Sequence, residues 1–214
     1  MLNLRTVLAG ILAYLLGSLT FGMLVPRMMG TSRDIRKEGS GNVGATNVLR
    51  TQGKLQGGLV LAGDLLKGSL AAGLGLWLAG DQGGGIAGLC AVLGHCFPLY
   101  FGFRGGKAVA TVAGVLFVLF PASMWILFPI FLLATVLSRM VSLGSLGGAA
   151  ALILCPFLFH ASLPVTVFCL CSSLLVIWKH QGNIQRILAG TENKLGQKKD
   201  GGQDGGQDGG QDGG

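Results

Sequence analysis

Long runs without a charged side chain dominate the pattern of polar and apolar positions in this chain of 214 residues. About 20 consecutive apolar residues are enough to cross a bilayer as a helix. The runs therefore predict an all-α, polytopic integral membrane protein with seven transmembrane helices. These helices are expected at about residues 4–26, 56–80, 84–103, 108–121, 122–138, 143–160 and 163–179. The first run is long and further spans follow it, so we interpret it as a span and not as a cleaved signal peptide.

The shortest predicted spans share the segment 108–138. Two spans there would each be about 23 Å long at 1.5 Å per residue, which is less than the hydrocarbon core of about 30 Å. A single tilted span is the alternative, and it would change the side of the membrane on which Arg139 lies. Pro121 offers a turn, and the segregation of basic residues described below favours two short spans.

Composition supports the membrane interpretation. Half of the residues are apolar and only 12% are charged, against roughly 25% in a soluble domain. Mean hydropathy is +0.63. Residues 196–214 instead repeat Gly, Gln and Asp, which is typical of a flexible solvated tail without chemistry of its own. We therefore expect a single membrane domain over residues 1–195.

The basic residues fall on one side of the predicted membrane. Of the 16 Lys and Arg residues, all but Arg5 lie in same-side loops, at span ends on that side, or in the C-terminal segment. The positive-inside rule makes that side cytoplasmic, with the N-terminus outside and the C-terminus inside. Membrane orientation explains most of the net charge of +7, and no aromatic residues interleave the basic ones, so nucleic acid is not expected as a partner.

The first polar motif is GSGNVGATNVLR at residues 39–50, in the longest predicted cytoplasmic loop. Its three closely spaced glycines allow backbone N–H groups to converge on one anion. Further donors come from side chains, and Arg50 offers a guanidinium fork suited to phosphate. The plainer alternative is a loop that merely turns. The candidate ligands of a phosphate are Ser40, Asn42, Thr46, Asn47 and Arg50.

The second motif joins GHCFP at 94–98 to GGKAVAT at 105–111. Gly105, Gly106 and Lys107 precede an apolar helix, so free N–H groups, the helix dipole and an ammonium would meet there as an anion site. A Lys at a span end that reaches for the interface is the alternative. His95 lies inside a predicted span, where it serves either catalysis or a local hydrogen bond.

Two more ionisable residues fall inside predicted spans. Asp64 and Lys67 are three residues apart on one helix face, which allows them to pair with each other. Pairing alone and an additional contact of Lys67 with the anion site remain equally open.

The third motif begins with HQGNI at 180–184, directly after the last span. His180 and Asn183 would share one helix face, and His180 can transfer protons near neutral pH. Glu192 could brace Arg186 or another cation. A basic juxtamembrane tail is the simpler interpretation.

Ser142 and Ser145, at the start of the predicted span 143–160, are a lesser candidate for a second phosphate site.

Together these motifs resemble one family, the bacterial acyl-phosphate:glycerol-3-phosphate acyltransferases (PlsY family). The resemblance rests on the three motifs in order between seven spans, including GTENK at 190–194, and it covers residues 1 to about 195. It implies transfer of a fatty acyl group from acyl phosphate to the 1-hydroxyl of glycerol 3-phosphate, giving lysophosphatidic acid and phosphate. No cofactor and no metal are implied.

The resemblance also implies roles for individual residues. Ser40, Arg50, His180 and Asn183 would be needed for activity, the Gly105–Lys107 segment would bind glycerol 3-phosphate, and Glu192 would be structural. Two positions depart from the family pattern. Ala108 follows Gly-Gly-Lys where a glycine is expected, and Gln181 follows His180 where a basic residue is expected. Both departures leave the key side chains in place.

The implied reaction needs two anion pockets, an oriented hydroxyl and an apolar slot for the acyl chain. The proton acceptor is either His180 or a substrate phosphate. The expected partners are glycerol 3-phosphate, fatty acyl phosphate, membrane lipid and an enzyme that produces acyl phosphate. We expect the protein in the bacterial cytoplasmic membrane with its active site on the cytoplasmic face. A small transporter of phosphorylated solutes is the alternative, although such sites usually lie near the bilayer midplane.

Overall fold

A computed structural model describes residues 3–31 and 33–196, and the predicted tail at 196–214 lies, apart from its first residue, outside them. Within this part the regular elements are all helices, which confirms the all-α class. The α-helices are α1 Leu4–Gly17, α2 Phe21–Met28, α3 Ala45–Gln52, α4 Lys54–Cys96, α5 Val109–Leu119, α6 Met124–Ser138, α7 Val141–Leu158, α8 Leu163–Lys179 and α9 Gln181–Leu188, and the short 3-10 helices are η1 Ile35–Lys37, η2 Leu99–Phe101 and η3 Pro121–Ser123.

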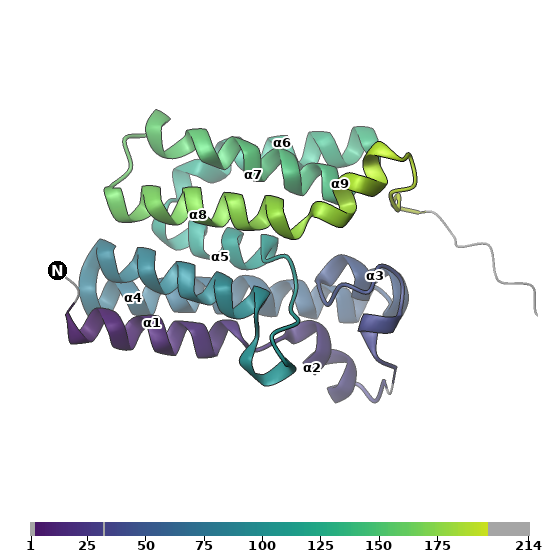
Figure 1. The fold of residues 1–214 in the computed structure, drawn as a ribbon, viewed down its shortest axis with the longest axis horizontal. Helices are drawn as coiled ribbons and strands as arrows, with labels where there is room; N and C mark the ends of the chain where they lie inside the picture. Colours follow the sequence, from purple (N-terminus) through teal and green to yellow (C-terminus); the bar gives the residue numbers. More distant parts are fainter. Residues whose placement is uncertain (1–2, 32, 197–214) are drawn as a thin grey trace, which may run out of the picture.

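Helix α4 is a hairpin of two arms (Figure 1). The backbone leaves the helical region at Ala79 and Gly80, and Gly80 has a φ of 59°, which a glycine adopts without strain. A Cβ on Gly75 would overlap the carbonyl of Gly83, so the two arms touch backbone to backbone. This confirms the predicted break between residues 80 and 84. The second arm ends at Cys96, earlier than expected, because Phe97 precedes a proline and leaves the helical conformation.

The first predicted span, 4–26, is instead two helices. Helices α1 and α2 meet at a bend of 46° around residues 18–20. Ser18 donates its hydroxyl proton to the carbonyl of Tyr14 and accepts a hydrogen bond from the N–H of Leu99. The hydroxyl of Ser18 at the break therefore contacts η2, the short 3-10 helix that follows the second arm of α4.

The segment 108–138 contains two helices, as predicted. Helix α5 ends at Leu119, η3 begins at Pro121, and α6 follows. By length and composition three helical stretches in the described residues are suited to cross a membrane, namely Lys54–Phe101, Pro121–Ser138 and Val141–Leu158. The bent pairs α1–α2 and α8–α9 raise this to five, and α5 is a shorter apolar helix. The stretch Lys54–Phe101 includes both arms of the α4 hairpin.

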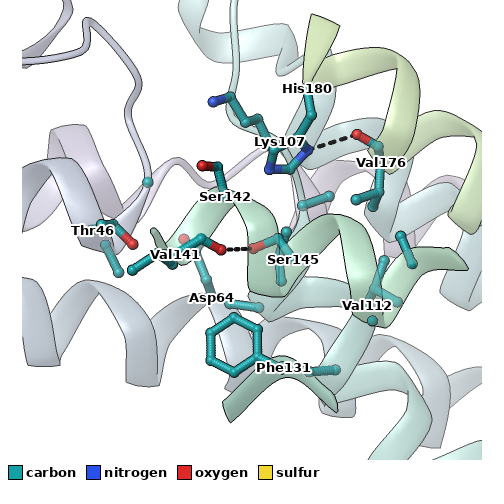
Figure 2. Close-up of a pocket in the computed structure, with 18 of the residues that line it drawn as sticks. Thr46, Asp64, Lys107, Val112, Phe131, Val141, Ser142, Ser145, Val176 and His180 are labelled. Atoms are coloured by element: carbon teal, nitrogen blue, oxygen red, sulfur yellow. Dashed lines mark hydrogen bonds between the residues drawn. The ribbon is translucent and has the colours of Figure 1, made fainter. Parts of the chain in front are cut away.

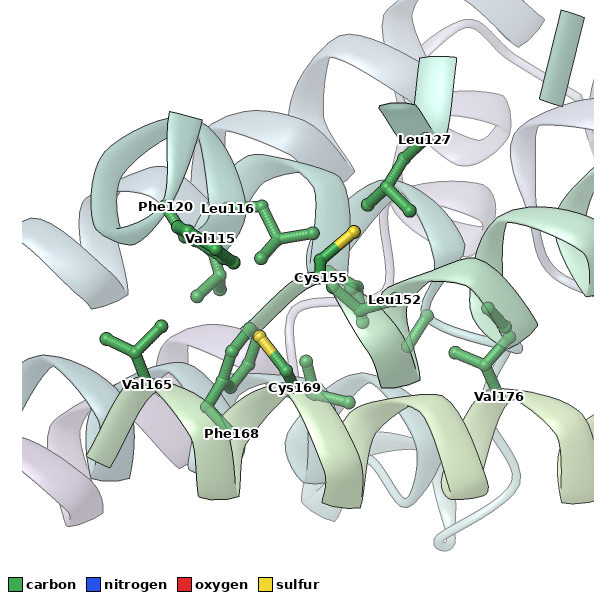
Figure 3. Packing of buried hydrophobic residues seen from close by; sticks show 14 of the residues in the cluster. Val115, Leu116, Phe120, Leu127, Leu152, Cys155, Val165, Phe168, Cys169 and Val176 are labelled. Carbon is green, nitrogen blue, oxygen red and sulfur yellow. The ribbon is translucent and has the colours of Figure 1, made fainter. Parts of the chain in front are cut away.

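The apolar side chains divide between a core and an outer surface. Figure 3 shows the core between α5, α6, α7 and α8, where Leu116, Leu152 and Phe168 pack together. Other large apolar side chains face outward, with Trp77 80% exposed and Trp125 84% exposed. Such an apolar exterior is stable in a lipid environment and not in water.

The polar connections converge at one end of the bundle, on the right in Figure 1, with α3 and α9. Three long-range contacts hold them together there. Lys107 bonds to Asn183, Lys179 donates to the carbonyl of Cys96 at 3.2 Å, and the N–H of Leu195 donates to the carbonyl of Arg139 at 2.7 Å. This end carries all three sequence motifs.

Candidate functional site

A cavity of about 440 Å³ opens among helices α3 to α8 and the C-terminal segment. One end is polar and lies among the three motifs, and the other is apolar and lies between helices. Figure 2 shows Lys107 and His180 at the polar end, with Val112 and Phe131 at the apolar end. The cavity therefore suits a ligand with an anionic head and a hydrocarbon chain.

Glu192 is the organising residue of the polar end. Its Oε1 accepts hydrogen bonds from Ser142 at 2.8 Å and Asn183 at 2.6 Å, and its Oε2 accepts one from Arg186 at 2.8 Å. Burial raises the pKa of this carboxyl, but the bonds from Asn183, Ser142 and Arg186 outweigh burial and hold the pKa below its usual range. The predicted brace of Arg186 by Glu192 is confirmed.

Lys107 extends from the α4–α5 connection into the same network. Its ammonium donates to Oδ1 of Asn183, whose own amide group donates to Glu192. Burial lowers the pKa of Lys107 to about 8, and the positive charge of Arg186 adds to this effect while Glu192 opposes it. A buried ammonium without a carboxylate in direct contact suits an anionic ligand.

His180 follows α8 and caps the start of α9. Its Nδ1 lies 2.7 Å from the carbonyl oxygen of Val176, as the dashed line in Figure 2 shows. A carbonyl only accepts, so Nδ1 carries the proton and Nε2 holds the free lone pair. A side chain in this form can accept a proton from a bound hydroxyl.

Helix α3 supplies the facing wall. The first motif was predicted to be a loop throughout, but residues 45–52 form a helix, so Thr46 and Arg50 share one face at i and i+4. Both line the cavity, as do Ser40 and Asn42. Within the described residues Arg50 has no ion pair or hydrogen bond, which leaves its guanidinium available to a ligand. The first turn of α3 also lines the cavity, and no side chain caps it.

Asn47 has a different role from the one predicted. Its Oδ1 accepts from the N–H of Ser40 at 2.9 Å, and its Nδ2 donates to the carbonyls of Glu38 and Ile35. All of its polar groups are therefore engaged in shaping the loop. Two N–H groups of the predicted nest are engaged as well, because those of Ser40 and Gly41 bond to Asn47 and Glu38.

Gly105 and Gly106 do not offer free N–H groups either. They donate to the carbonyls of Cys96 and His95, at 3.3 and 3.1 Å. A Cβ on Gly106 would overlap the ring of His95, so these glycines allow a close approach that positions Lys107. Ala108 has a φ of 60°, a left-handed conformation that explains why the family pattern places a glycine there.

Ser142 and Ser145 line the cavity, but both hydroxyl protons are engaged. Ser142 donates to Glu192, and Ser145 donates to the carbonyl of Val141 at 2.9 Å. Their predicted use as phosphate donors is therefore corrected, and only the start of α7 remains as a donor surface.

Asp64, Lys67 and His95 all lie within α4, where Asp64 and His95 line the cavity and Lys67 does not. Lys67 is 1% exposed and pairs with Asp64 at 2.8 Å. The sequence left open whether Lys67 only pairs with Asp64 or also faces the anion site; the pairing is observed, and Lys67 does not line the cavity.

Sequence reasoning missed three polar residues that line the cavity, Ser172, Ser173 and Asn193. Ser172 and Ser173 are buried on α8, and their hydroxyls have no hydrogen-bond partner in the described residues. Serines within an apolar run are common in membrane helices, so the sequence contained no distinguishing signal for them.

Comparison with known proteins gives a consistent result. Residues 7–190 match the family model described as glycerol-3-phosphate acyltransferase. A glycerol-3-phosphate acyltransferase of Pseudomonas syringae pv. tomato is 48% identical over 185 residues, covering 84% of this chain and 93% of the relative. One of Geobacillus kaustophilus is 43% identical over 190 residues, covering 89% and 96%.

Two crystal structures of PlsY (YgiH), an integral membrane glycerol 3-phosphate acyltransferase, are similar at 38% identity. The glycerol 3-phosphate form has a TM-score of 0.85 and the match covers 89% of this chain and 96% of that one. The lysophosphatidic acid form has a TM-score of 0.82 and the match covers 89% and 95%.

The Glu192 network generates a stability prediction. Glu192→Gln replaces a carboxylate that accepts from three side chains, so it should lower the free energy of unfolding by about 1–3 kcal/mol. Thermal unfolding in detergent measures the effect. Because the carboxyl pKa is lowered in the folded state, this contribution is present above the ordinary value of 4.5 and is lost as the pH falls through the lowered pKa.

Glu38→Gln is the matched control, since the Glu38 carboxylate makes, within the described residues, only a long ion pair of 3.9 Å with the exposed Arg33. It should change stability by less than about 0.5 kcal/mol. Equal loss in both variants would contradict the central role of Glu192.

Proposed function

The chain belongs to the glycerol-3-phosphate acyltransferase family, and we propose that it transfers a fatty acyl group from acyl phosphate to the 1-hydroxyl of glycerol 3-phosphate. The observation that carries this proposal is the cavity, whose polar end joins Lys107, Arg50 and the lone pair of His180 while its other end is apolar. Lysophosphatidic acid and phosphate would be the products.

The polar end offers two neighbouring anion positions. We assign the phosphate of glycerol 3-phosphate to Lys107, which Asn183 and Glu192 hold in place. The phosphate of the acyl donor would lie against Arg50, Ser40 and the uncapped first turn of α3. The two cations would hold both substrates beside the 1-hydroxyl that is acylated. They would lower the activation barrier of acyl transfer by orienting the substrates and by stabilising negative charge.

The proposed acyl transfer forms one bond, breaks one bond and moves one proton. The 1-hydroxyl oxygen forms an ester bond to the acyl carbon, and the bond from that carbon to the phosphate oxygen breaks. The hydroxyl proton passes to Nε2 of His180 and then to the departing phosphate. The bond from Nδ1 to the carbonyl of Val176 supports this role for His180, because it keeps Nε2 as the acceptor.

The apolar end would take the acyl chain. Leu116, Leu127, Phe131 and Leu152 line it, and they come from α5, α6 and α7. A chain there would remain in an apolar environment while its head reaches the polar end. The residues that line the cavity thus account for both a soluble and a lipid substrate.

The membrane arrangement follows from the same proposal. The protein is a membrane protein with an all-helical fold, and we propose seven spans in one domain over residues 1–195. The convergence of basic connections at the polar end supports a cytoplasmic active site, an external N-terminus and a location in the cytoplasmic membrane. An enzyme that makes acyl phosphate would then supply the donor.

The proposed function is tested by offering purified protein acyl phosphate, acyl-CoA and acyl carrier protein side by side with glycerol 3-phosphate. Lysophosphatidic acid should form from acyl phosphate alone, with release of phosphate. A protein that moved phosphorylated solutes across vesicles without making this product would instead be a transporter.

Lys107 generates a prediction about pH. Its ammonium loses its proton as the pH rises through about 8, so kcat/KM for glycerol 3-phosphate should fall above that pH and approach a tenfold loss per pH unit. Steady-state kinetics between pH 6.5 and about 9.5 measure the profile. Lys107→Arg is the control, because a guanidinium stays charged and its profile should show no decline near pH 8. Identical profiles would contradict the assignment.

Gly148 generates a prediction about chain length. It lines the cavity about 1.7 helical turns along α7 from Ser142, and a Cβ there meets no atom within 4 Å. Gly148→Leu should therefore fill the slot and lower kcat/KM for palmitoyl phosphate at least about tenfold more than for a short acyl phosphate such as butanoyl phosphate. Gly73→Leu is the control, since its Cβ also meets open space and Gly73 does not line the cavity. An equal loss of kcat/KM for all chain lengths would show that the acyl chain does not lie along this part of the cavity.

A further inference from the structure

Three ionisable side chains form a buried cluster between the two arms of α4. Asp64 and Lys67 lie on the first arm and His95 lies on the second, and each is at most 4% exposed. Buried ionisable groups inside a membrane protein are costly unless they are paired and hydrogen-bonded. The proposed reaction uses none of them directly, so the presence of three buried ionisable side chains here needs another explanation.

The ammonium of Lys67 contacts three polar groups, through two hydrogen bonds and one ion pair. It lies 2.8 Å from the carbonyl oxygen of Leu19, 2.8 Å from Oδ1 of Asp64 and 2.8 Å from Nδ1 of His95. The Leu19 carbonyl lies in the break between α1 and α2. Since an ammonium has three donors and no acceptor, the third bond requires a lone pair on Nδ1 of His95.

The distances support this form of His95. Its Nδ1 is 2.8 Å from Lys67 but 3.4 Å from Asp64, so the closer partner is the donor and not the acceptor. A neutral His95 with a lone pair on Nδ1 carries its proton on Nε2. That atom lies against Gly106, and His95 lines the cavity. The described residues provide no acceptor for this N–H.

We propose that His95 donates a hydrogen bond from Nε2 to a phosphate oxygen of bound substrate, in a tautomer that Lys67 and Asp64 impose. His95 and His180 then have opposite forms, because Nδ1 of His180 donates to a carbonyl while Nδ1 of His95 accepts from an ammonium. One histidine gives the cavity a donor and the other an acceptor. Lys67 and Asp64 are positioning residues that do not touch substrate. This inference rests on the proposed acyl transfer.

Two conservative variants of His95 distinguish the loss of its hydrogen bond to substrate from a loss of packing. In His95→Gln the amide nitrogen can occupy the place of Nε2, whereas His95→Asn retains an acceptor near Nδ1 and loses the donor toward the cavity. His95→Asn should lower kcat/KM about 10- to 100-fold, the range of a hydrogen bond to a charged group. His95→Gln should recover most of that loss.

The KM values for the two substrates show which phosphate accepts the hydrogen bond from His95. A higher KM for glycerol 3-phosphate assigns the bond to that substrate, and a higher KM for acyl phosphate assigns it to the donor. Equal activity of the two variants, a better His95→Asn than His95→Gln, or a loss confined to kcat would each overturn the proposal. His160→Asn is the control, because His160 is exposed beyond α7 and has a φ of 49°, which Asn tolerates.

A second measurement does not depend on the activity of any variant. The chain has only 3 histidines, so ¹⁵N-labelled histidine in the wild-type protein gives a spectrum that His160→Asn and His180→Asn can assign. His95 should show a protonated Nε2 and an unprotonated Nδ1, and inorganic phosphate should shift the Nε2 signal. A protonated Nδ1, or no response to phosphate, would overturn the proposal.

The positioning role is tested by changing both charges together in Asp64→Asn with Lys67→Met, which avoids an unpaired buried ion. The single tautomer of His95 should become a mixture. An unchanged tautomer would refute the role of Lys67. If the wild-type protein made no lysophosphatidic acid, the proposed function would fail instead, and the spectrum would still report on His95.

Discussion

The ammonium of Lys67 is the interaction on which the arrangement of the N-terminal half depends. A buried ammonium needs three acceptors, and Lys67 takes them from the α1–α2 break, from its own helix arm and from the opposite arm. A straight α4 would separate residues 67 and 95 by about 42 Å at 1.5 Å per residue, so the bond to His95 is possible only in a hairpin. Small residues at Gly75 and Gly83 allow the arms to approach closely enough.

This arrangement continues into the functional end of the molecule. The carbonyl of His95 accepts from Gly106, and the ring of His95 lies against that glycine, so the second arm of α4 fixes the segment that carries Lys107. Lys107 then meets Asn183, and Asn183 meets Glu192. A chain of direct contacts thus runs from the break in the first helix to the C-terminal motif. Four residues of this chain of contacts line the cavity, namely His95, Lys107, Asn183 and Glu192.

Glu192 has the corresponding role for the C-terminal half. Its carboxylate accepts one hydrogen bond from a side chain of α7 and two from side chains of α9. One of these donors, Asn183, also accepts the bond from Lys107. The carboxylate balances Arg186, while the ammonium of Lys107 keeps its charge for a ligand. The apolar core of α5, α7 and α8 lies directly behind this network. The polar end is therefore held by bonds and the apolar end by packing.

The sequence by itself determined the class of fold, the position of most helices, the three motifs and the family resemblance. Runs of apolar residues and the segregation of Lys and Arg are local properties, because lipid and water select them residue by residue. The turn at Pro121 is also local, because a proline ends a helix through its own ring. The sequence left open whether Glu192 braces Arg186 or another cation, and the structure shows Arg186.

Tertiary structure alone decided which polar groups remain available. The N–H groups of Ser40, Gly41, Gly105 and Gly106 and the amide of Asn47 are engaged by partners, so the glycines serve close approach and not anion binding. The tautomers of His95 and His180 likewise depend on partners that the chain brings together in space. Hydrogen-bond satisfaction is a property of the whole fold, since each buried donor is assigned only when the distant acceptor arrives.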